Sequence, residues 1–547
     1  MSRVANQPAS SAPQAPKSGS NGVAARDWQR AIEALDSGDT VHCRALCHQL
    51  LRDEPDSARV LWLSANAALQ EGDFNAVLEH VRAVRPLLPS LAPEQMVAIT
   101  RLLIMVGEFE AAWLQLAELR HRAPAGNVLL AVGEQLSMLE RYPEALDCLR
   151  MLESRGTRHP MLSFLISSAC RYTGDFAGAI EAAEATLRLQ PDFAHAHWAL
   201  SHLGAKADAP RRVDRIRKSL VSLGRRSDSR TSQLQSALAM LWHALFRELD
   251  ALDDRTGAWL ALSNGLALKR NLQPHDVLAE NRLFDDLIDT YSPEFIQLRP
   301  GPTAGNPTPV FIVGMPRTGT TLIERIITNH GDAASCGELN ELQLLVKRAT
   351  GHWSPEFLDA TTATRLRNAN LCNLGDDYLQ SVAWRVGDRP YMVDKHQSNF
   401  LLAGIIARCL PHARIIHVRR DPLDACFSNL KEPFAQHAYS YSNDQCDVAN
   451  HYRNYERLMR HLHEVADEHI LEVSYEALVR DHLRESHRIL DFIGLTIESG
   501  LDDITRNRSP IASASSVQVR EPIHDRNIGA WRRYSSQLEV LQEALDV

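Results

Sequence analysis

The chain has 547 residues, enough for two or three domains, and a formal net charge of −9 at pH 7. This acidic balance argues against bulk nucleic-acid binding, which favours a basic face, although a few local arginines would still suffice for an anionic cofactor. The 9 cysteines form no C-x-x-C pair, which predicts reduced, mostly buried thiols in a cytoplasmic protein and no metal site.

No apolar run approaches the ~20 residues of a membrane span. Residues 1–22 are rich in Ser, Ala, Pro, Gln and Asn and lack the apolar stretch of a secretory signal. We expect them to form a disordered tail.

Residues 25–204 contain a repeat of about 34 residues, the period of tetratricopeptide repeats. A unit usually shows a Gly-Asp or Gly-Glu turn, a small residue soon after it and a proline near its end. The turns are Gly38-Asp39, Gly72-Asp73, Gly107-Glu108, Arg141-Tyr142 and Gly174-Asp175; the small residues are Ala76, Ala112, Ala145 and Ala179; the prolines are Pro55, Pro89, Pro124 and Pro191. The pattern predicts about five stacked units of two antiparallel helices each.

The repeat array carries no chemistry of its own. We expect its concave surface to bind a peptide or protein, or a second copy of the chain as a homo-oligomer; the alternative is a rigid spacer that stabilises the catalytic domain. Residues 205–306 are predicted to be a helical connector, with an amphipathic helix pair over 233–247 and 255–270. The breaker-rich stretch 301–308 predicts a linker, and the catalytic domain is predicted over 307–547.

Residues 309–324, PVFIVGMPRTGTTLIE, predict a buried strand, a glycine-punctuated loop and a helix that opens at Thr320. This layout directs backbone N–H groups and a helix N-terminus at a phosphate. The spacing from Gly314 to Gly319 is that of nucleotide-triphosphate loops, but Thr320 takes the place of their lysine. Transfer of a γ-phosphate needs that lysine, so the loop predicts a nucleotide with a less charged 5′ tail. The alternative is that the glycines serve only the turn.

This loop resembles the 5′-phosphosulfate loop of sulfotransferases that use PAPS (3′-phosphoadenosine 5′-phosphosulfate), and is closest to the G-x-P-R-[ST]-G-T-T-L of the tyrosylprotein and heparan-type branches. The loop residues Arg317, Thr318, Gly319, Thr320 and Thr321 are therefore expected to bind PAPS. The guanidinium of Arg317 is also expected to stabilise charge during transfer.

Sulfuryl transfer to a hydroxyl needs a base for the acceptor's proton. Glu338, in the segment Ser-Cys-Gly-Glu-Leu, is our candidate, and Glu341 one helical turn later is an alternative. The tyrosylprotein branch has C-G-E-E here and uses its second glutamate, a place that Leu339 takes in this chain. A purely structural role for Glu338 would be to interact with a helix dipole.

Residues 391–400, YMVDKHQSNF, look like the D-K-x-P-x-N-F segment of bacterial repeat-bearing sulfotransferases, with Gln397 in place of the proline. Lys395 is expected to stabilise the bridging oxygen as the sulfuryl group leaves. His396 is a rival base, since small-molecule sulfotransferases use a histidine. Neighbours on an extended segment point to opposite sides, so Lys395 and His396 should not both face the sulfate.

Residues 413–428 predict a strand that runs into Arg-Asp-Pro and a helix. An arginine followed eight residues later by a serine is the 3′-phosphate motif of the family, which Arg420 and Ser428 fit. Arg419 is an alternative, and Asp421 suits a helix-capping role. The 3′-phosphate distinguishes PAPS from ATP, so this segment is expected to set cofactor specificity.

Two later segments also resemble the family. Tyr475, in a strand ending Y-E-x-L, is expected near the adenine, with a core role as the alternative. In the late loop that closes over the nucleotide, Ser515, Ser516 and Arg520 are expected at the 3′-phosphate or the adenosine.

The sequence thus predicts an α-helical tetratricopeptide solenoid followed by an α/β domain with a parallel sheet and a phosphate-binding loop. The resemblance implies sulfuryl transfer from PAPS, without a metal, to an acceptor hydroxyl, for which tyrosine in a peptide or protein is the leading candidate. A glycan, lipid or small phenol is an alternative acceptor. Two other hypotheses are a repeat scaffold with a degenerate, inactive cofactor domain and a nucleotide kinase, which Thr320 disfavours.

Overall fold

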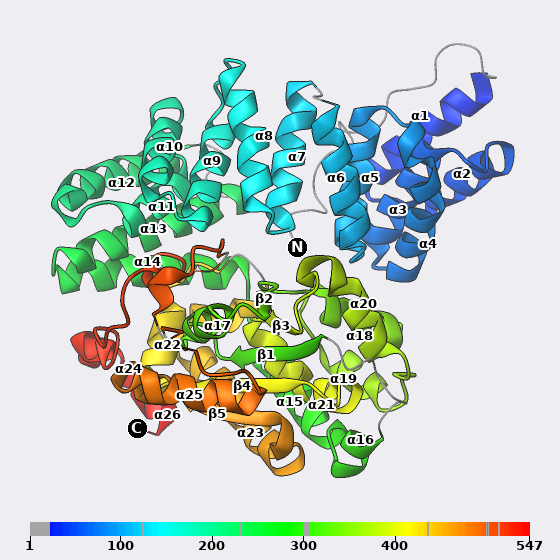
Figure 1. Ribbon diagram of the computed structural model, residues 1–547. Helices are drawn as coiled ribbons and strands as arrows, with labels where there is room; N and C mark the ends of the chain where they lie inside the picture. The colour runs from blue at the N-terminus through cyan, green and yellow to red at the C-terminus, as the bar shows by residue number, and fades with distance from the viewer. Residues whose placement is uncertain are drawn as a thin grey trace. The chain divides into compact units, whose positions relative to one another are not determined.

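A computed structural model describes residues 22–122, 125–226, 228, 231–298, 307–434, 437–498, 500–501, 503–511, 513 and 515–546. The predicted tail up to residue 21, the repeat proline Pro124 and the linker residues 301–306 lie outside the described residues. The chain forms two compact units, residues 1–152 with 340–356 and residues 153–339 with 357–547 (Figure 1). The predicted boundaries near residues 204 and 306 stay predictions. Within the described ranges, no helix has the length and apolar character to cross a membrane.

Helices build the first unit, as the repeat pattern predicts. They are α1 (Gly22–Ser37), α2 (Thr40–Asp53), α3 (Ala58–Glu71), α4 (Phe74–Val84), the 3-10 helix η2 (Arg85–Ser90), α5 (Pro93–Met105), α6 (Phe109–His121), α7 (Gly126–Met138) and α8 (Tyr142–Ser154). Consecutive helices pack against each other along most of this series, including α1 on α2, α3 on α4 and α5 on α6.

Two local effects explain the Gly-Asp turns of the repeats. Gly72 ends α3 with a φ of 73°, which residues with a side chain rarely adopt. Asp73 then accepts a hydrogen bond of 3.1 Å from the N–H of Ala76 and so caps α4. In the same way, Gly38 follows α1 with a φ of 80°, and Asp39 caps α2. These turns confirm the repeat pattern.

A helix from the C-terminal half of the chain, α18 (Glu341–Thr350), belongs to this first unit. Leu344 lies so close to Gly107 that a Cβ on the glycine would be 2.9 Å from the Leu344 Cδ1. Beyond α18, the Trp353 ring is stacked on Phe74 with 6.1 Å between ring centroids. The segment 340–356 therefore packs on the turns of two successive repeats.

The second unit begins with further helices. They are α9 (Pro160–Thr173), α10 (Phe176–Leu189), α11 (Ala194–Leu203), η3 (Lys206–Asp208), α12 (Ala209–Gly224), α13 (Ser232–Ala251), α14 (Arg255–Leu272), α15 (Val277–Thr290) and α16 (Pro293–Gln297). α13 packs against α11, α12 and α14. A buried ion pair joins α12 to α13, because Arg212 donates hydrogen bonds of 2.6 and 2.9 Å to Glu248.

A parallel sheet of five strands forms the centre of the second unit. The strands are β1 (Thr308–Gly314), β2 (Ala333–Ser335), β3 (Tyr391–Asp394), β4 (Arg414–Arg419) and β5 (Ile470–Ser474), in the order β2-β3-β1-β4-β5. β1 pairs with β3 on one side and with β4 on the other. The strand order reverses there, and ligands of such folds bind beyond the carboxyl ends of the strands at that point.

Helices cover both faces of the sheet (Figure 1). On one face α17, α24 and α25 bury apolar side chains around Val310 and Ile312. On the other face Phe311 stacks on Tyr378 of α20, with 5.7 Å between ring centroids. β1 is thus apolar on both sides, as is usual for a central parallel strand. The arrangement confirms the predicted α/β domain.

The other elements of this unit follow in chain order. They are α17 (Thr320–Thr328), α19 (Ala360–Leu366), α20 (Leu374–Val386), η4 (Gln397–Leu402), α21 (Ala403–Cys409), α22 (Pro422–Leu430), η5 (His437–Asn443), α23 (Gln445–Val465), η6 (Asp467–His469), α24 (Tyr475–Arg480), α25 (His482–Ile493), η7 (Ile504–Arg506), η8 (Gln518–Arg520), η9 (Ala530–Gln537) and α26 (Glu539–Leu545).

Candidate functional site

The loop between β1 and α17 has little room for side chains at its glycines. A Cβ on Gly314 would lie 2.6 Å from the carbonyl oxygen of Val418 on β4. A Cβ on Gly319, whose φ is 104°, would lie 2.6 Å from the Tyr475 ring. Arg317, between them, has a φ of 69°, which is uncommon for a residue with a side chain. The backbone is therefore held in a special conformation at the N-terminus of α17, where helices attract anions.

The threonines of the loop are buried. Thr318 donates a hydrogen bond of 2.7 Å to the carbonyl oxygen of Met315 and so closes the loop on itself. Thr320 is the first residue of α17, and Thr321 donates to the Ser513 hydroxyl at 3.4 Å. Of these three threonines, Thr321 lines the cavity beside the loop.

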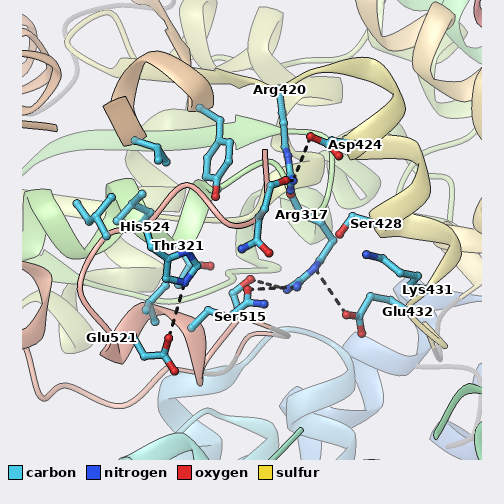
Figure 2. Close-up of a pocket in the computed structure, with 18 of the residues that line it drawn as sticks. Arg317, Thr321, Arg420, Asp424, Ser428, Lys431, Glu432, Ser515, Glu521 and His524 are labelled. Carbon is cyan, nitrogen blue, oxygen red and sulfur yellow. Dashed lines mark hydrogen bonds and ion pairs between the residues drawn. The ribbon is translucent and has the colours of Figure 1, made fainter. Parts of the chain in front are cut away.

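A cavity of about 250 Å³ opens beside this loop (Figure 2). It lies within the second unit. Its walls come from α13, the loop, α22, α24 and the C-terminal segment after residue 503. Its lining residues include Arg247, Asp250, Arg317, Gly319, Thr321, Arg420, Asp424, Ser428, Lys431, Glu432, Tyr475, Ser515, Gln518, Glu521, His524 and Asn527. Predicted site residues from four separate segments therefore meet at one cavity.

Arg420 lines this cavity and contacts the loop, α22 and α24. Its guanidinium donates to the carbonyl oxygen of Arg317 at 3.0 Å, lies 3.7 Å from the Asp424 carboxylate and stacks over the Tyr475 ring at 4.8 Å. Ser428, another lining residue, lies eight residues later in the second turn of α22 and is 8% exposed. The structure thus places the two residues of the predicted 3′-phosphate motif at the same cavity.

The Arg317 side chain reaches into the cavity from the loop. It contacts the Ser515 hydroxyl and lies 3.6 Å from the Glu432 carboxylate. Burial lowers the pKa of its guanidinium, and the nearby Arg420 adds to this effect. The Nε atoms of Arg317 and Arg420 are both buried, and neither has a hydrogen-bond acceptor among the residues that the structure describes. Two guanidinium groups with unused donors suit a bound phosphate or sulfate.

The C-terminal segment is fixed to the cavity by Asp424. Its carboxylate accepts hydrogen bonds from the backbone N–H groups of Gly529, at 2.6 Å, and Trp531, at 3.1 Å. Tyr475, at the start of α24, is 8% exposed and lines the cavity. The late segment expected to close over the nucleotide therefore forms part of the same wall.

The two predicted catalytic residues away from the loop also meet. The N–H of Lys395, just after β3, donates to the carbonyl oxygen of Gly337 at 2.9 Å, which holds the segment after β2 beside the end of β3. The Lys395 ammonium contacts the Glu338 carboxylate. The lysine side chain is 2% exposed and the glutamate side chain 27%, so the pair is open to solvent only on the glutamate side. Neither residue is among those that line the cavity described above.

The two alternative bases, His396 and Glu341, lie in surroundings different from those of Glu338. The Nδ1 of His396 accepts a hydrogen bond of 3.3 Å from the N–H of Ser398, and its ring packs on Phe357. Burial lowers the pKa of His396 to about 3, with Lys395 adding to the shift. Glu341 is the first residue of α18 and belongs to the first unit, whereas Glu338 belongs to the second.

Three residues named from the sequence point elsewhere. Arg520 donates a hydrogen bond of 3.1 Å to the carbonyl oxygen of Tyr172, at the end of α9. The Ser516 hydroxyl accepts one of 3.0 Å from Arg171. Arg419, the alternative to Arg420, has a side chain that is 46% exposed. None of the three lines the cavity.

Residues 309–499 match the sulfotransferase family. The matched segment contains all five strands of the sheet apart from the first residue of β1, together with the loop 314–319, Arg420 and Ser428. A protein of Aquifex aeolicus, itself of uncharacterised function, is 29% identical over 266 residues, which are 47% of this chain and 35% of that protein. The chain thus spans 35% of the length of this curated relative.

Three solved structures show weaker likeness. The sulfotransferase domain of the Synechococcus PCC 7002 olefin synthase is 20% identical and covers 45% of this chain and 97% of its own, with a TM-score of 0.31. Sulfotransferase STF1 of Mycobacterium tuberculosis is 14% identical and covers 61% and 98%, with a TM-score of 0.27. The TPR domain of P58(IPK) is 16% identical and covers 47% and 94%, with a TM-score of 0.19.

Sequence reasoning missed two cationic residues that line the cavity beside the motifs of the predicted sulfotransferase domain. Arg247 comes from α13, before the predicted start of that domain; its guanidinium lies over Trp198, and its Nε is buried without an acceptor in the described structure. Lys431 follows α22, and its ammonium lies 4.4 Å from the centre of the Phe427 ring. Arginine and lysine are common on any surface, so only their spatial convergence marks them out.

Proposed function

We propose that this chain transfers a sulfuryl group from PAPS to an acceptor hydroxyl, with tyrosine in a peptide or protein as the acceptor. The supporting observation is the convergence of the loop 314–319 with Arg420 and Ser428 at one cavity. Four cationic side chains line it, those of Arg247, Arg317, Arg420 and Lys431. A 3′-phosphate would give the unused guanidinium donors an acceptor, which ATP lacks at that position.

The proposed reaction needs few protein groups. The acceptor oxygen attacks sulfur, the bond between sulfur and the bridging oxygen of the donor breaks, and adenosine 3′,5′-bisphosphate leaves. Glu338 takes the acceptor's proton, for which its partly exposed carboxylate is suited. Lys395 and Arg317 stabilise the negative charge that develops on the bridging oxygen, and a buried cation does this more strongly than a solvated one. The scheme requires no metal.

The tyrosine acceptor has two supports. The loop resembles that of the tyrosylprotein branch, and the repeat helices offer a surface for a peptide. His396 is a poor base for small phenols, because its pKa is about 3 and its Nδ1 accepts a backbone hydrogen bond. A glycan, a lipid and a small phenol are the other acceptors to be compared.

Calorimetric titration of the full chain with adenosine 3′,5′-bisphosphate tests the donor class. We expect micromolar or tighter binding, and no binding of ATP with Mg²⁺. Labelled PAPS then tests the acceptor, with a tyrosine peptide compared against its phenylalanine counterpart, a glycan and a phenol. Absence of bisphosphate binding would leave a non-catalytic repeat scaffold as the remaining hypothesis; label transfer to the glycan alone would refute the tyrosine acceptor.

From the lowered pKa of Lys431 we predict that the protein takes up a proton when it binds the bisphosphate. Burial and the neighbouring arginines lower the pKa of Lys431 to about 8, so near pH 8 about half of the free protein lacks this proton. A bound anion favours the charged ammonium and raises the pKa again. Affinity should therefore fall as pH rises from 8 towards 10. Titrations in buffers of different ionisation enthalpy at pH 8 measure the uptake, which Lys431→Met should abolish; equal uptake in that variant would assign the proton elsewhere.

A further inference from the structure

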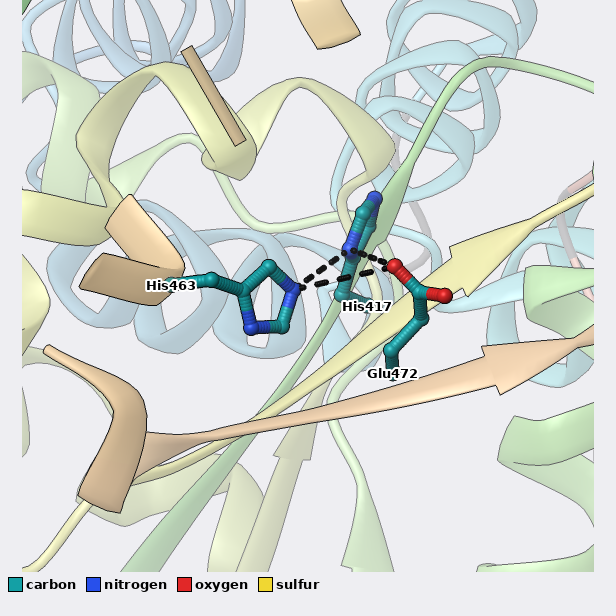
Figure 3. Close-up of side chains that lie close together, drawn as sticks. All are labelled: His417, His463 and Glu472. Carbon is teal, nitrogen blue, oxygen red and sulfur yellow. Dashed lines mark hydrogen bonds and ion pairs between the residues drawn. The ribbon is translucent and has the colours of Figure 1, made fainter. Parts of the chain in front are cut away.

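Three potential metal ligands meet on the two last strands of the sheet, apart from the cavity (Figure 3). His417 on β4 and Glu472 on β5 are register partners, and His463 comes from α23. The Nδ1 of His417 lies 3.2 Å from the Nε2 of His463 and 3.8 Å from the Oε2 of Glu472. The Nε2 of His463 lies 3.9 Å from that same oxygen.

These separations suit a small divalent ion. Zinc binds imidazole nitrogen and carboxylate oxygen at about 2.0–2.2 Å, so two ligands of a tetrahedral site lie about 3.3–3.6 Å apart. The observed separations of 3.2, 3.8 and 3.9 Å lie within about 0.3 Å of that range. Two histidines and one carboxylate with a fourth position open to water form a known type of zinc site.

Neighbouring side chains contact the ring nitrogens of His417 and His463 that face away from the cluster. The Tyr455 hydroxyl lies 2.5 Å from the Nε2 of His417 and directs its own hydrogen at the carbonyl oxygen of Val418, 3.5 Å away. In the tautomer that donates its Nε2–H to this hydroxyl, the Nδ1 of His417 keeps a bare lone pair. The Nδ1 of His463 faces the Asp467 carboxylate at 3.8 Å, while its Nε2 faces His417. Such partners commonly orient histidine ligands.

The local charge also favours a cation. Arg419 lies close to Glu472, but its guanidinium is shared between the Oε1 of Glu472, at 3.2 Å, and Glu456, at 3.4 Å. The other oxygen of Glu472 faces the histidines. Asp467 adds a third carboxylate on the other side of the cluster, 3.8 Å from the Nδ1 of His463. His463 is 24% exposed and Glu472 42%, so an ion can enter from solvent.

We propose that His417, His463 and Glu472 bind a divalent transition metal, with Zn²⁺ as the probe ion. Such an ion would tie β4 and β5 to α23. The scattered cysteines predicted no metal site, and this cluster uses none of them. The proposal is independent of sulfuryl transfer, although Arg420 follows His417 by only three residues, or about 10 Å of extended chain.

The test is a titration of the metal-stripped full chain with Zn²⁺ in competition with a chromophoric chelator. We expect one ion per chain with a submicromolar Kd, a higher melting temperature with Zn²⁺, and strong visible absorption when Co²⁺ replaces it, as tetrahedral sites give. His463→Gln should weaken binding at least 100-fold and Glu472→Gln at least 10-fold. His487→Gln, an exposed histidine on α25, is the matched control and should bind as the wild type does.

Melting temperatures without metal show whether each variant still folds. A folded His463→Gln variant that binds Zn²⁺ as tightly as the wild type would overturn the proposal. Failure of the wild type to bind one equivalent would overturn it as well, and would show that one imidazole simply donates a hydrogen bond to the other.

Discussion

Glu338→Gln should lower the sulfuryl-transfer rate by about 10²- to 10⁴-fold, the usual contribution of a general base. Glutamine keeps the shape of the side chain but cannot take the acceptor's proton. Because Glu338 does not line the cavity, binding of adenosine 3′,5′-bisphosphate should stay unchanged. Single-turnover kinetics with labelled PAPS and a tyrosine peptide measure the rate, and calorimetry measures the binding.

Glu341→Gln is the matched control for this experiment, because it makes the same change three residues later. Full activity in Glu338→Gln together with loss in Glu341→Gln would transfer the role of base to Glu341. Lys395→Met should also lose about 10²- to 10³-fold in rate. Since Lys395 and Glu338 contact each other, the double variant should be little slower than the slower single variant. Multiplicative losses would argue that the two residues act separately.

Arg420→Met should reduce the affinity for adenosine 3′,5′-bisphosphate by about 10- to 150-fold, which corresponds to a charged hydrogen bond of about 1.5–3 kcal/mol. The affinity for adenosine 5′-monophosphate, which lacks the 3′-phosphate, should change little. The ratio of the two dissociation constants is the decisive measurement, because a general loss of structure would weaken both ligands equally.

Arg419→Met is the control for that variant, since its side chain is 46% exposed and absent from the cavity wall. It should keep the wild-type ratio of dissociation constants. Arg247→Met should raise the dissociation constant of the bisphosphate relative to that of the monophosphate, as Arg420→Met does, if the helices before residue 307 take part in binding the donor. An unchanged ratio in Arg420→Met would remove this arginine from the 3′-phosphate site and with it the family's motif.

Those parts of the site that lie within one continuous segment of the chain could be predicted from the sequence. A strand, a loop with glycines at 314 and 319 and a helix are one continuous segment, and steric limits at those glycines constrain which residues fit. The repeat turns were predictable for the same reason, since Gly72 and Asp73 act on adjacent helix ends. The spacing from Arg420 to Ser428 likewise lies within one strand–helix junction.

Residues brought in by packing could not be predicted. Arg247 lies on an amphipathic helix 70 residues before the loop, and no local pattern distinguishes it from other arginines of that segment. The contact of Arg520 with the Tyr172 carbonyl oxygen at the end of α9 was not predictable either, because no local pattern relates two segments so far apart in the chain. The side-chain cluster of His417, His463 and Glu472 arises from strand register and helix packing together.

The placement of α18 in the first unit has a consequence for Glu338. The chain passes between the two units at residues 152–153, 339–340 and 356–357, and Glu338 lies two residues from the second passage. The segment 337–344 spans this passage. Gly337 is hydrogen-bonded to Lys395 after β3, and Leu344 packs on Gly107 in the first unit. The proposed base therefore lies within a few peptide bonds of a point where the chain leaves one unit for the other.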